Sequence, residues 1–172
     1  MNDESFHSTC LSAQMKDCVE ALKAKDVELA YLALLTREGL KPLSRWESPL
    51  DERGLALLRR MGLIVREIDR TVRTGKEVLE TIFAVSPAAI GVYERAFDGR
   101  PVDKSAATVR MEGFLFGYPP CCIEQYVKHP YAPNDQPDED RKILFHWACQ
   151  GCRITPLLLP AYAKVYAAVK NG

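Results

Sequence analysis

The stretch LIVREIDRTVRTGKEVLETIFAVS, residues 63–86, decides the fold class, because the apolar pattern changes period here. Two segments rich in β-branched and apolar residues flank the short turn signal TGK at 74–76. Gly75 can adopt the positive φ that such a turn needs without a steric cost. The pattern predicts a β-hairpin at about 63–86, within a chain that is otherwise helical.

On both sides of the hairpin, apolar residues recur three and four positions apart, which is the spacing of a buried helix face. Asp26 is a typical N-cap, and Ser86-Pro87 is a typical helix start. The helices predicted in this half of the chain cover 8–25, 27–39, 50–62 and 87–99. The fold class is therefore α+β, mainly α-helical, with one β-hairpin.

Helix, helix, hairpin and helix in this order resemble a winged-helix module, with 50–62 as the recognition helix and the loop at Gly75 as the wing. Residues 51–76 carry seven basic and four acidic side chains, a weak basic bias. The formal net charge of the chain is zero, so no chain-wide field favours nucleic acid or an anionic membrane. In the alternative interpretation the hairpin covers a helix pair or contacts a second copy in a homodimer.

The segment DGRPVDKSA, residues 98–106, is rich in turn-forming and polar residues, and it is the best candidate for a junction. It divides the chain into a module with the hairpin, 1–100, and a helical cysteine-rich module, 101–172. The helices predicted in the second module cover 105–116, 119–129, 139–149 and 155–170, with Pro160 as a kink or a delayed start in the last.

The composition favours a cytoplasmic protein. The N-terminal residues MNDESFHSTC are polar and acidic, unlike a secretory signal peptide, and no segment has the roughly 20 apolar residues of a membrane helix. The cytoplasm keeps thiols reduced, so the six cysteines are not expected to form a disulfide framework. Clustered cysteines in that compartment indicate a metal site or redox chemistry.

Four of the cysteines fall within 32 residues, in the motifs PPCC at 119–122 and HWACQGC at 146–152. The spacing Cys149-x-x-Cys152 lets two sulfurs turn toward one point, and Gly151 gives the backbone freedom to do so. If 139–149 is helical, His146 shares a face with Cys149. The predicted metal ligands are Cys121, Cys122, His146, Cys149 and Cys152.

Two ligand sets remain open, because neighbouring side chains on a helix diverge by about 100°. Either all four cysteines hold zinc or an iron–sulfur cluster, or three cysteines with His146 form a Cys₃His site. Thiolates suit these groups and not magnesium or calcium. The same residues also allow a thiol–disulfide protein without metal, with Cys121 and Cys122 activated at a helix N-terminus, or simple packing of a helical core.

The C-terminal third resembles an uncharacterised prokaryotic family, a domain of unknown function with the motifs GYPxCC and HWxCxxC followed by a TPLLLP-like segment. These motifs lie here at 117–122, 146–152 and 155–160, and the resemblance covers about 105–165. It implies that the cysteines belong to one constellation, without a substrate. The chain has no nucleophile-elbow, Walker or dinucleotide motif, so the catalytic residues are unknown. The sequence predicts a metal- or cluster-binding protein, with a redox protein and a nucleic-acid-binding regulator as alternatives.

Overall fold

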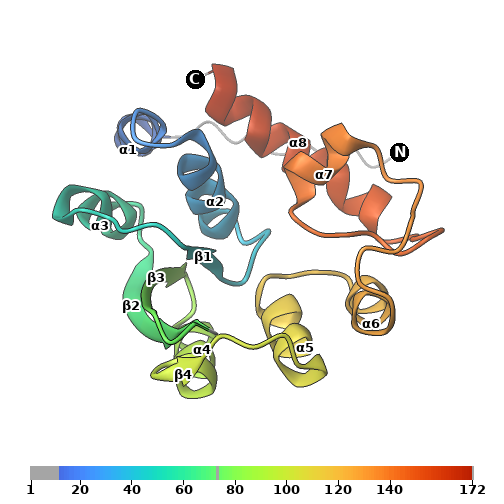
Figure 1. The fold of residues 1–172 in the computed structure, drawn as a ribbon. Helices are drawn as coiled ribbons and strands as arrows, with labels where there is room; N and C mark the ends of the chain where they lie inside the picture. Colours follow the sequence, from blue (N-terminus) through green and yellow to red (C-terminus); the bar gives the residue numbers. More distant parts are fainter. Residues whose placement is uncertain (1–11, 73, 172) are drawn as a thin grey trace, which may run out of the picture.

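The computed structural model describes residues 12–72 and 74–171 as eight helices and a four-stranded sheet (Figure 1). The helices are α1 Ala13–Lys23, α2 Val27–Arg37, α3 Glu52–Arg60, α4 Pro87–Phe97, α5 Ala106–Leu115, α6 Pro120–Lys128, α7 Asp138–Leu144 and α8 Thr155–Asn171. The strands are β1 Ser44–Trp46, β2 Ile64–Thr71, β3 Glu77–Ala84 and β4 Arg100–Pro101. The predicted α+β, mainly helical fold class is confirmed.

The predicted hairpin is the centre of the sheet. Strands β2 and β3 pair antiparallel from Ile64–Ala84 to Thr71–Glu77, and Gly75 in the turn has φ +81°. Strand β1 pairs antiparallel with the other edge of β3, and β4 pairs parallel with β2, so the order is β1-β3-β2-β4. The two outer strands were not predicted, because segments of three and two residues are too short to show a period.

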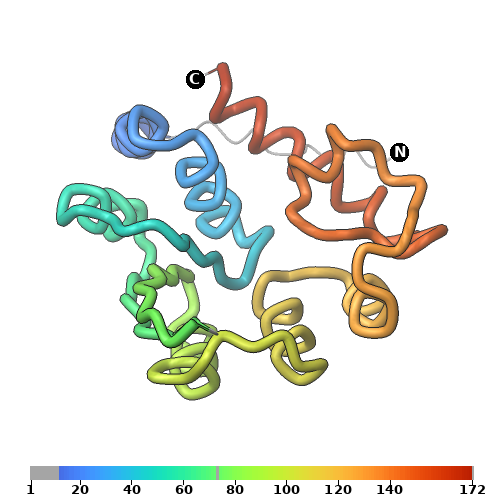
Figure 2. The backbone as a smooth tube through the Cα atoms, in the orientation of Figure 1, coloured from blue at the N-terminus to red at the C-terminus, as the bar shows by residue number. Residues whose placement is uncertain are grey.

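The sheet separates two hydrophobic cores, because alternate side chains of a strand point to opposite faces. Val65 and Phe83 pack on the α1, α2 and α3 side, while Ile68 and Ile82 pack on the α4 and α5 side. The first core also contains Tyr162, Val165 and Val169 of α8. Figure 2 shows how the chain passes from the sheet through α5 and α6 before α8 returns beside α2.

The predicted division near residue 100 stays a prediction, and helices from both sides of it share one core. The Tyr31 hydroxyl of α2 donates hydrogen bonds to the backbone carbonyls of Ile143, at 2.9 Å, and Tyr162, at 3.2 Å. These bonds fix α7 and α8 against the N-terminal helices. The cysteine-rich part of the chain is therefore attached to the core by buried contacts.

The helix starts mostly follow the capping residues. Asp26 and Ser105 accept hydrogen bonds from amides of the first turns of α2 and α5, and Pro87 opens α4. Ser86 precedes α4, but its side chain makes no cap hydrogen bond, contrary to its expected role. The predicted start of the first helix at residue 8 lies outside the described residues.

The winged-helix interpretation stays a prediction, and α3 is the helix to which it assigns recognition. Between β1 and β2, the described residues contain one helix, α3, and its Arg53, Arg59 and Arg60 are exposed. Helix α2 is buried from Leu29 to Thr36 and cannot serve as an exposed recognition helix. None of the helices in the described residues has the length and apolar character needed to cross a bilayer.

A network of buried charges joins the sheet to α4 and α5. Arg70 is only 1 % exposed at its side chain, and its Nη1 lies 3.6 Å from Glu80 Oε2 and 3.0 Å from Glu112 Oε1. Arg45 Nη1 contacts the same Glu112 oxygen at 2.6 Å. The hydroxyl of Tyr93 donates to Glu80 at 2.9 Å. Opposite charges that are buried together in this way compensate for one another.

Lys41 is a second buried charge, with aromatic rings in place of a carboxylate. Its Nζ donates to the Phe116 carbonyl at 2.9 Å and lies 4.8 Å from the centre of the Tyr118 ring. Burial lowers the pKa of Lys41 to about 7, so at neutral pH the ammonium is close to losing its proton.

We expect the stability of the protein to rise with pH between about 7 and 10, because unfolded Lys41 binds a proton that the folded state holds weakly. Each unit of pKa displacement corresponds to about 1.4 kcal/mol. Urea unfolding of wild type and Lys41→Met across this range measures the effect. Because Lys41→Met removes this titration, the stability of wild type relative to the variant should rise with pH; a difference that stays constant with pH would contradict the assignment.

Candidate metal centre

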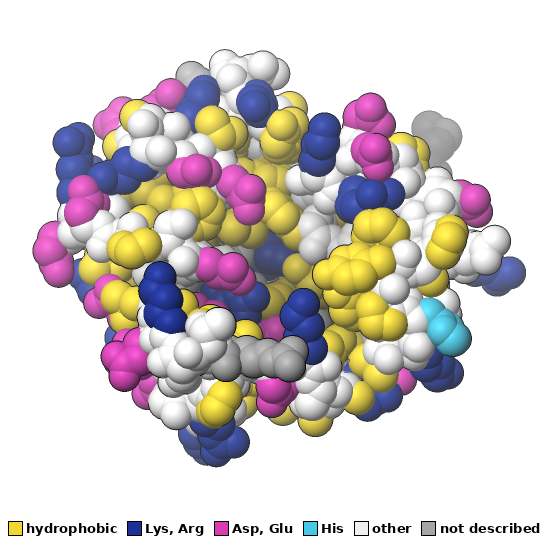
Figure 3. All heavy atoms as spheres, viewed as in Figure 1, with side chains coloured by type: hydrophobic (Ala, Val, Ile, Leu, Met, Phe, Trp, Pro, Cys, Tyr) yellow, Lys and Arg dark blue, Asp and Glu magenta, His cyan; other side chains and the backbone are white. Residues whose placement is uncertain are grey.

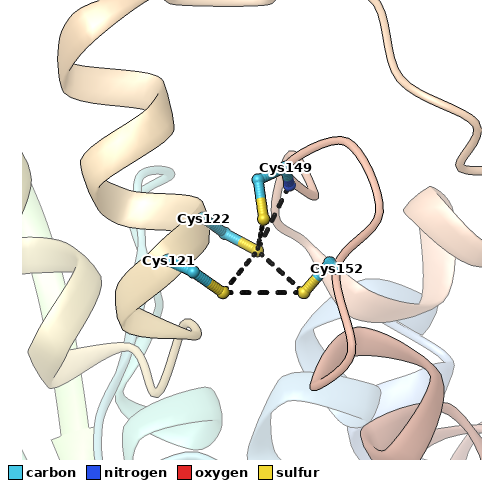
Figure 4. Close-up of side chains that lie close together, drawn as sticks. All are labelled: Cys121, Cys122, Cys149 and Cys152. Carbon is cyan, nitrogen blue, oxygen red and sulfur yellow. Dashed lines mark hydrogen bonds between the residues drawn. The ribbon is translucent and has the colours of Figure 1, made fainter.

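Four cysteines from two distant segments meet at one point (Figure 4). Cys121 and Cys122 lie in the first turn of α6, and Cys149 and Cys152 lie in the connection between α7 and α8. The four Sγ atoms all lie within 4.8 Å of one another. The structure therefore brings together four of the five predicted ligands as a group that could hold a metal ion.

The adjacent cysteines both reach this point because they stand at the very start of a helix. Pro119 is the N-cap and Pro120 the first residue of α6, so neither proline removes a hydrogen bond that the helix needs. The two Sγ atoms are 4.0 Å apart. Cys122 is buried and Cys121 is exposed, so the group lies at the boundary between the interior and solvent.

The second pair is held by a tight turn. The amide of Cys152 donates to the Cys149 carbonyl at 3.1 Å, and Gly151 has φ +66°. A residue with a side chain adopts that conformation only at a cost, so the turn depends on this glycine. The freedom predicted for Gly151 is confirmed.

Four of the six distances between the sulfurs match the edges of a small tetrahedron, and the other two are no longer than 4.8 Å. Sγ–Sγ separations are 3.7 Å for Cys121–Cys152, 3.9 Å for Cys122–Cys149 and 3.4 Å for Cys122–Cys152. A zinc ion with Zn–S bonds of about 2.3 Å would place tetrahedral sulfurs roughly 3.8 Å apart. The group therefore has the dimensions of a site for one metal ion.

Hydrogen-bond donors already surround two of the sulfurs. The Cys149 amide donates to Cys122 Sγ at 3.3 Å. Thr155 donates to Cys152 Sγ from its amide at 3.4 Å and from its hydroxyl at 3.2 Å. Such donors stabilise a thiolate more than a thiol, and thiolates are the form that binds metal.

The pKa values of the thiols are shifted in different directions. Burial raises the pKa of Cys149 to about 11 and raises that of Cys122 well above its usual range. At Cys152 burial acts in the same sense, but hydrogen bonds from Thr155 and from the Ile154 amide outweigh it and lower the pKa to about 6. At neutral pH Cys152 is therefore the thiolate that a cation would meet first.

His146 does not join the sulfurs, and the helix predicted to carry it is shorter than expected. Helix α7 ends at Leu144, and Phe145 adopts a left-handed conformation with φ 59°. The prediction that His146 and Cys149 share one face of a helix is therefore wrong. His146 Nε2 lies 2.9 Å from Thr155 Oγ1, and its Nδ1 lies 3.2 Å from the Leu144 carbonyl. His146 thus contacts a residue that supports the cysteines.

The proton on His146 can be assigned from these partners. A carbonyl only accepts, so Nδ1 carries the hydrogen, and burial lowers the pKa of His146 to about 4, which keeps the ring neutral. Nε2 is then an acceptor for Thr155. The single hydroxyl proton of Thr155 has two acceptors, His146 Nε2 and Cys152 Sγ.

Thr155 was missed in the sequence, although it follows Cys152 by three residues and begins a predicted helix. We expect Thr155→Val to weaken zinc binding about 10- to 100-fold, because partners of this kind orient and charge-balance a ligand. Thr155→Ser keeps the hydroxyl and should bind as wild type does. Competition with a zinc chelator measures the affinities; equal affinities for the valine and serine variants would refute the role of the hydroxyl.

The remaining cysteine of the described residues is structural. Cys18 is fully buried in the first core. No family model, no curated protein and no solved structure matches the chain. The resemblance to the GYPxCC and HWxCxxC family stays a prediction.

Proposed function

We propose that the chain binds one zinc ion through Cys121, Cys122, Cys149 and Cys152, and that the ion joins α6 to the start of α8. The observation that carries the proposal is the set of short Sγ–Sγ distances, 3.4 to 4.0 Å for the pairs in contact. Four thiolates in a tetrahedron are the usual donor set of a structural zinc site.

The compactness of the group favours one ion over an iron–sulfur cluster. A cluster places several iron and sulfide atoms between its cysteines, which requires the sulfurs to stand further apart than they would around one ion. All four Sγ atoms here lie within 4.8 Å. A cluster would need the turn at Cys149–Cys152 to move away from α6.

A structural role follows from what the ion would connect. The segment from Phe145 to Ile154 has no regular secondary structure, and α6 makes its main helix contact with α5. A bond from α6 to both cysteines of this segment would fix the segment and the first turn of α8 together. Metal binding of this kind contributes directly to folding.

Elemental analysis and an absorption spectrum of anaerobically purified protein test the proposal. The expected result is one zinc per chain without a visible band. Iron together with a broad visible absorption band would indicate an iron–sulfur cluster instead of a zinc ion. Either that result or the absence of any metal would overturn the proposal.

Zinc binding should release protons, since two of the ligands are thiols before the ion arrives. The raised pKa values of Cys122 and Cys149 keep both protonated at pH 7, so we expect at least two protons per zinc. The apparent affinity should accordingly increase with pH. Calorimetry in buffers with different ionisation enthalpies counts the protons; release of none would contradict these assignments.

A thiol–disulfide function without metal is the second candidate, and the lowered pKa of Cys152 is the observation that favours it. Its Sγ lies 3.4 Å from Cys122 Sγ and 3.7 Å from the exposed Cys121 Sγ. Thiol titration of untreated folded protein distinguishes the two functions. All four thiols reacting freely without metal release would support this candidate over zinc binding.

A further inference from the structure

A cavity of about 600 Å³ adjoins the cysteine group, lined by residues of β1, α5, α6 and the segment after α7. Cys122 and His146 form part of its wall. The face of the molecule in Figure 3 is hollowed between the part built from the sheet and the part built from the last helices. The volume falls in the range of small-molecule sites, roughly 300–1,000 Å³.

Six aromatic side chains contribute to the walls of this cavity. Tyr131 stands edge-on between Tyr126 and Trp147, with ring centres 5.1 and 5.5 Å away. On the other side, the Tyr118 ring lies 5.5 Å from His146. The aromatic residues that line the cavity are Phe116, Tyr118, Tyr126, Tyr131, Phe145 and Trp147. Rings arranged in this way offer flat apolar faces to a planar ligand.

The cavity already holds one flat group on an aromatic face. The guanidinium of Arg141 lies 4.1 Å from the centre of the Trp147 ring, and both residues line the cavity. One face of Trp147 is therefore already covered, which leaves the exposed Tyr131 ring available to a ligand.

One acceptor of the buried charge network faces the cavity. The Glu112 side chain is 20 % exposed and lines the cavity, and Arg45 and Arg70 both donate to its Oε1. Within the described part of the chain, no hydrogen bond reaches Glu112 Oε2. The two guanidinium groups hold the carboxylate in place, so the cavity presents an acceptor for an N–H donor.

We propose that this cavity binds a planar nitrogen heterocycle of the nucleobase type, stacked on Tyr131 beside Trp147, with an N–H edge at Glu112. Aromatic stacking tolerates many bases, and the carboxylate selects for a ring with N–H or amino donors. The proposal goes beyond zinc binding and does not require it, since the contacts it uses come from an aromatic ring and a carboxylate of the protein.

Trp147 reports binding directly. The chain has two tryptophans, so Trp46→Phe leaves Trp147 as the fluorescent residue. Titration of this zinc-loaded variant with guanosine, adenosine, cytidine and uridine should give saturable quenching by at least one of them, at millimolar concentration or below. Absence of saturation with all four nucleosides would overturn the proposal.

Two further variants in the same background locate the ligand. Tyr131→Ala should weaken binding about tenfold or more, because it removes a stacking ring that is 60 % exposed and carries little of the fold. Phe114→Ala removes an exposed aromatic residue of α5 that does not line the cavity, and should bind as the parent does. Equal affinities for the two variants would overturn the proposal.

Glu112→Gln tests the polar contact separately. It should weaken the preferred nucleoside while leaving the Trp147 emission spectrum unchanged, and an unaltered affinity would refute the proposed contact at Glu112. Zinc content is measured in every preparation, because protein that binds nucleoside but holds no metal would refute the proposed zinc function and leave this inference intact.

Discussion

Cys122→Ala is expected to abolish stoichiometric zinc binding. Its melting temperature should lie roughly 10 °C below that of the zinc-loaded wild type. A ligand at a thousand times its dissociation constant stabilises by about 4 kcal/mol. For a chain of this size, each kcal/mol corresponds to about 2–4 °C. Cys122 is buried and its Sγ contacts three other sulfurs, so its loss opens the centre of the group. Elemental analysis and thermal unfolding measure the two effects.

The matched control is the same substitution at another buried cysteine. Cys18→Ala removes a fully buried thiol from the first core, so it should lower the stability through lost packing and retain one zinc per chain. The zinc content of the two variants therefore distinguishes the loss of a metal ligand, in Cys122→Ala, from the loss of a core side chain, in Cys18→Ala. Full zinc content in Cys122→Ala would mean that this sulfur is no ligand.

Glu80→Ala is expected to destabilise the fold by about 3–5 kcal/mol, because removing one partner leaves a buried charge uncompensated. Glu80 is 6 % exposed at its side chain and balances Arg70 and Arg45 across the sheet. The substitution also removes the acceptor of the Tyr93 hydroxyl. Denaturant unfolding of the zinc-loaded protein gives the free energy, and zinc content should stay unchanged.

An exposed ion pair provides the comparison for that network. Arg110 contacts both carboxylate oxygens of Glu124, at 2.6 and 2.9 Å, on the outer surfaces of α5 and α6. Solvent screens this pair, so Glu124→Ala should change the stability little. If both glutamate variants were equally stable, burial would not determine the strength of the Glu80 contacts.

The sequence allowed prediction of the elements whose patterns are long. The hairpin at 63–86 has eight residues in each strand, enough for the alternation that places Val65 and Phe83 on one face and Ile68 and Ile82 on the other. The caps at Asp26 and Ser105 act within one helical turn, so they too could be read locally. Strands β1 and β4 depend on pairing with distant strands, which no local pattern reveals.

At the site, the cysteine spacing predicted which sulfurs meet. The position of His146 could not be predicted in the same way, because it depends on the backbone conformation after α7. The helical pattern of 139–149 continues past Leu144, but Phe145 turns into the left-handed region and directs His146 toward Thr155. That turn is fixed by tertiary packing, since Phe145 packs against Tyr31 of α2. A residue that supports ligands through a hydroxyl, such as Thr155, has no spacing rule of its own.

Zinc K-edge X-ray absorption of the purified protein is the most direct test of the proposed four-cysteine site. The expected result is a single shell of four sulfur atoms at about 2.3 Å around one zinc per chain. Four sulfurs exclude both a Cys₃His site through His146 and an aquated surface ion. Nitrogen or oxygen atoms in the first shell, or iron with a second metal atom nearby, would contradict it.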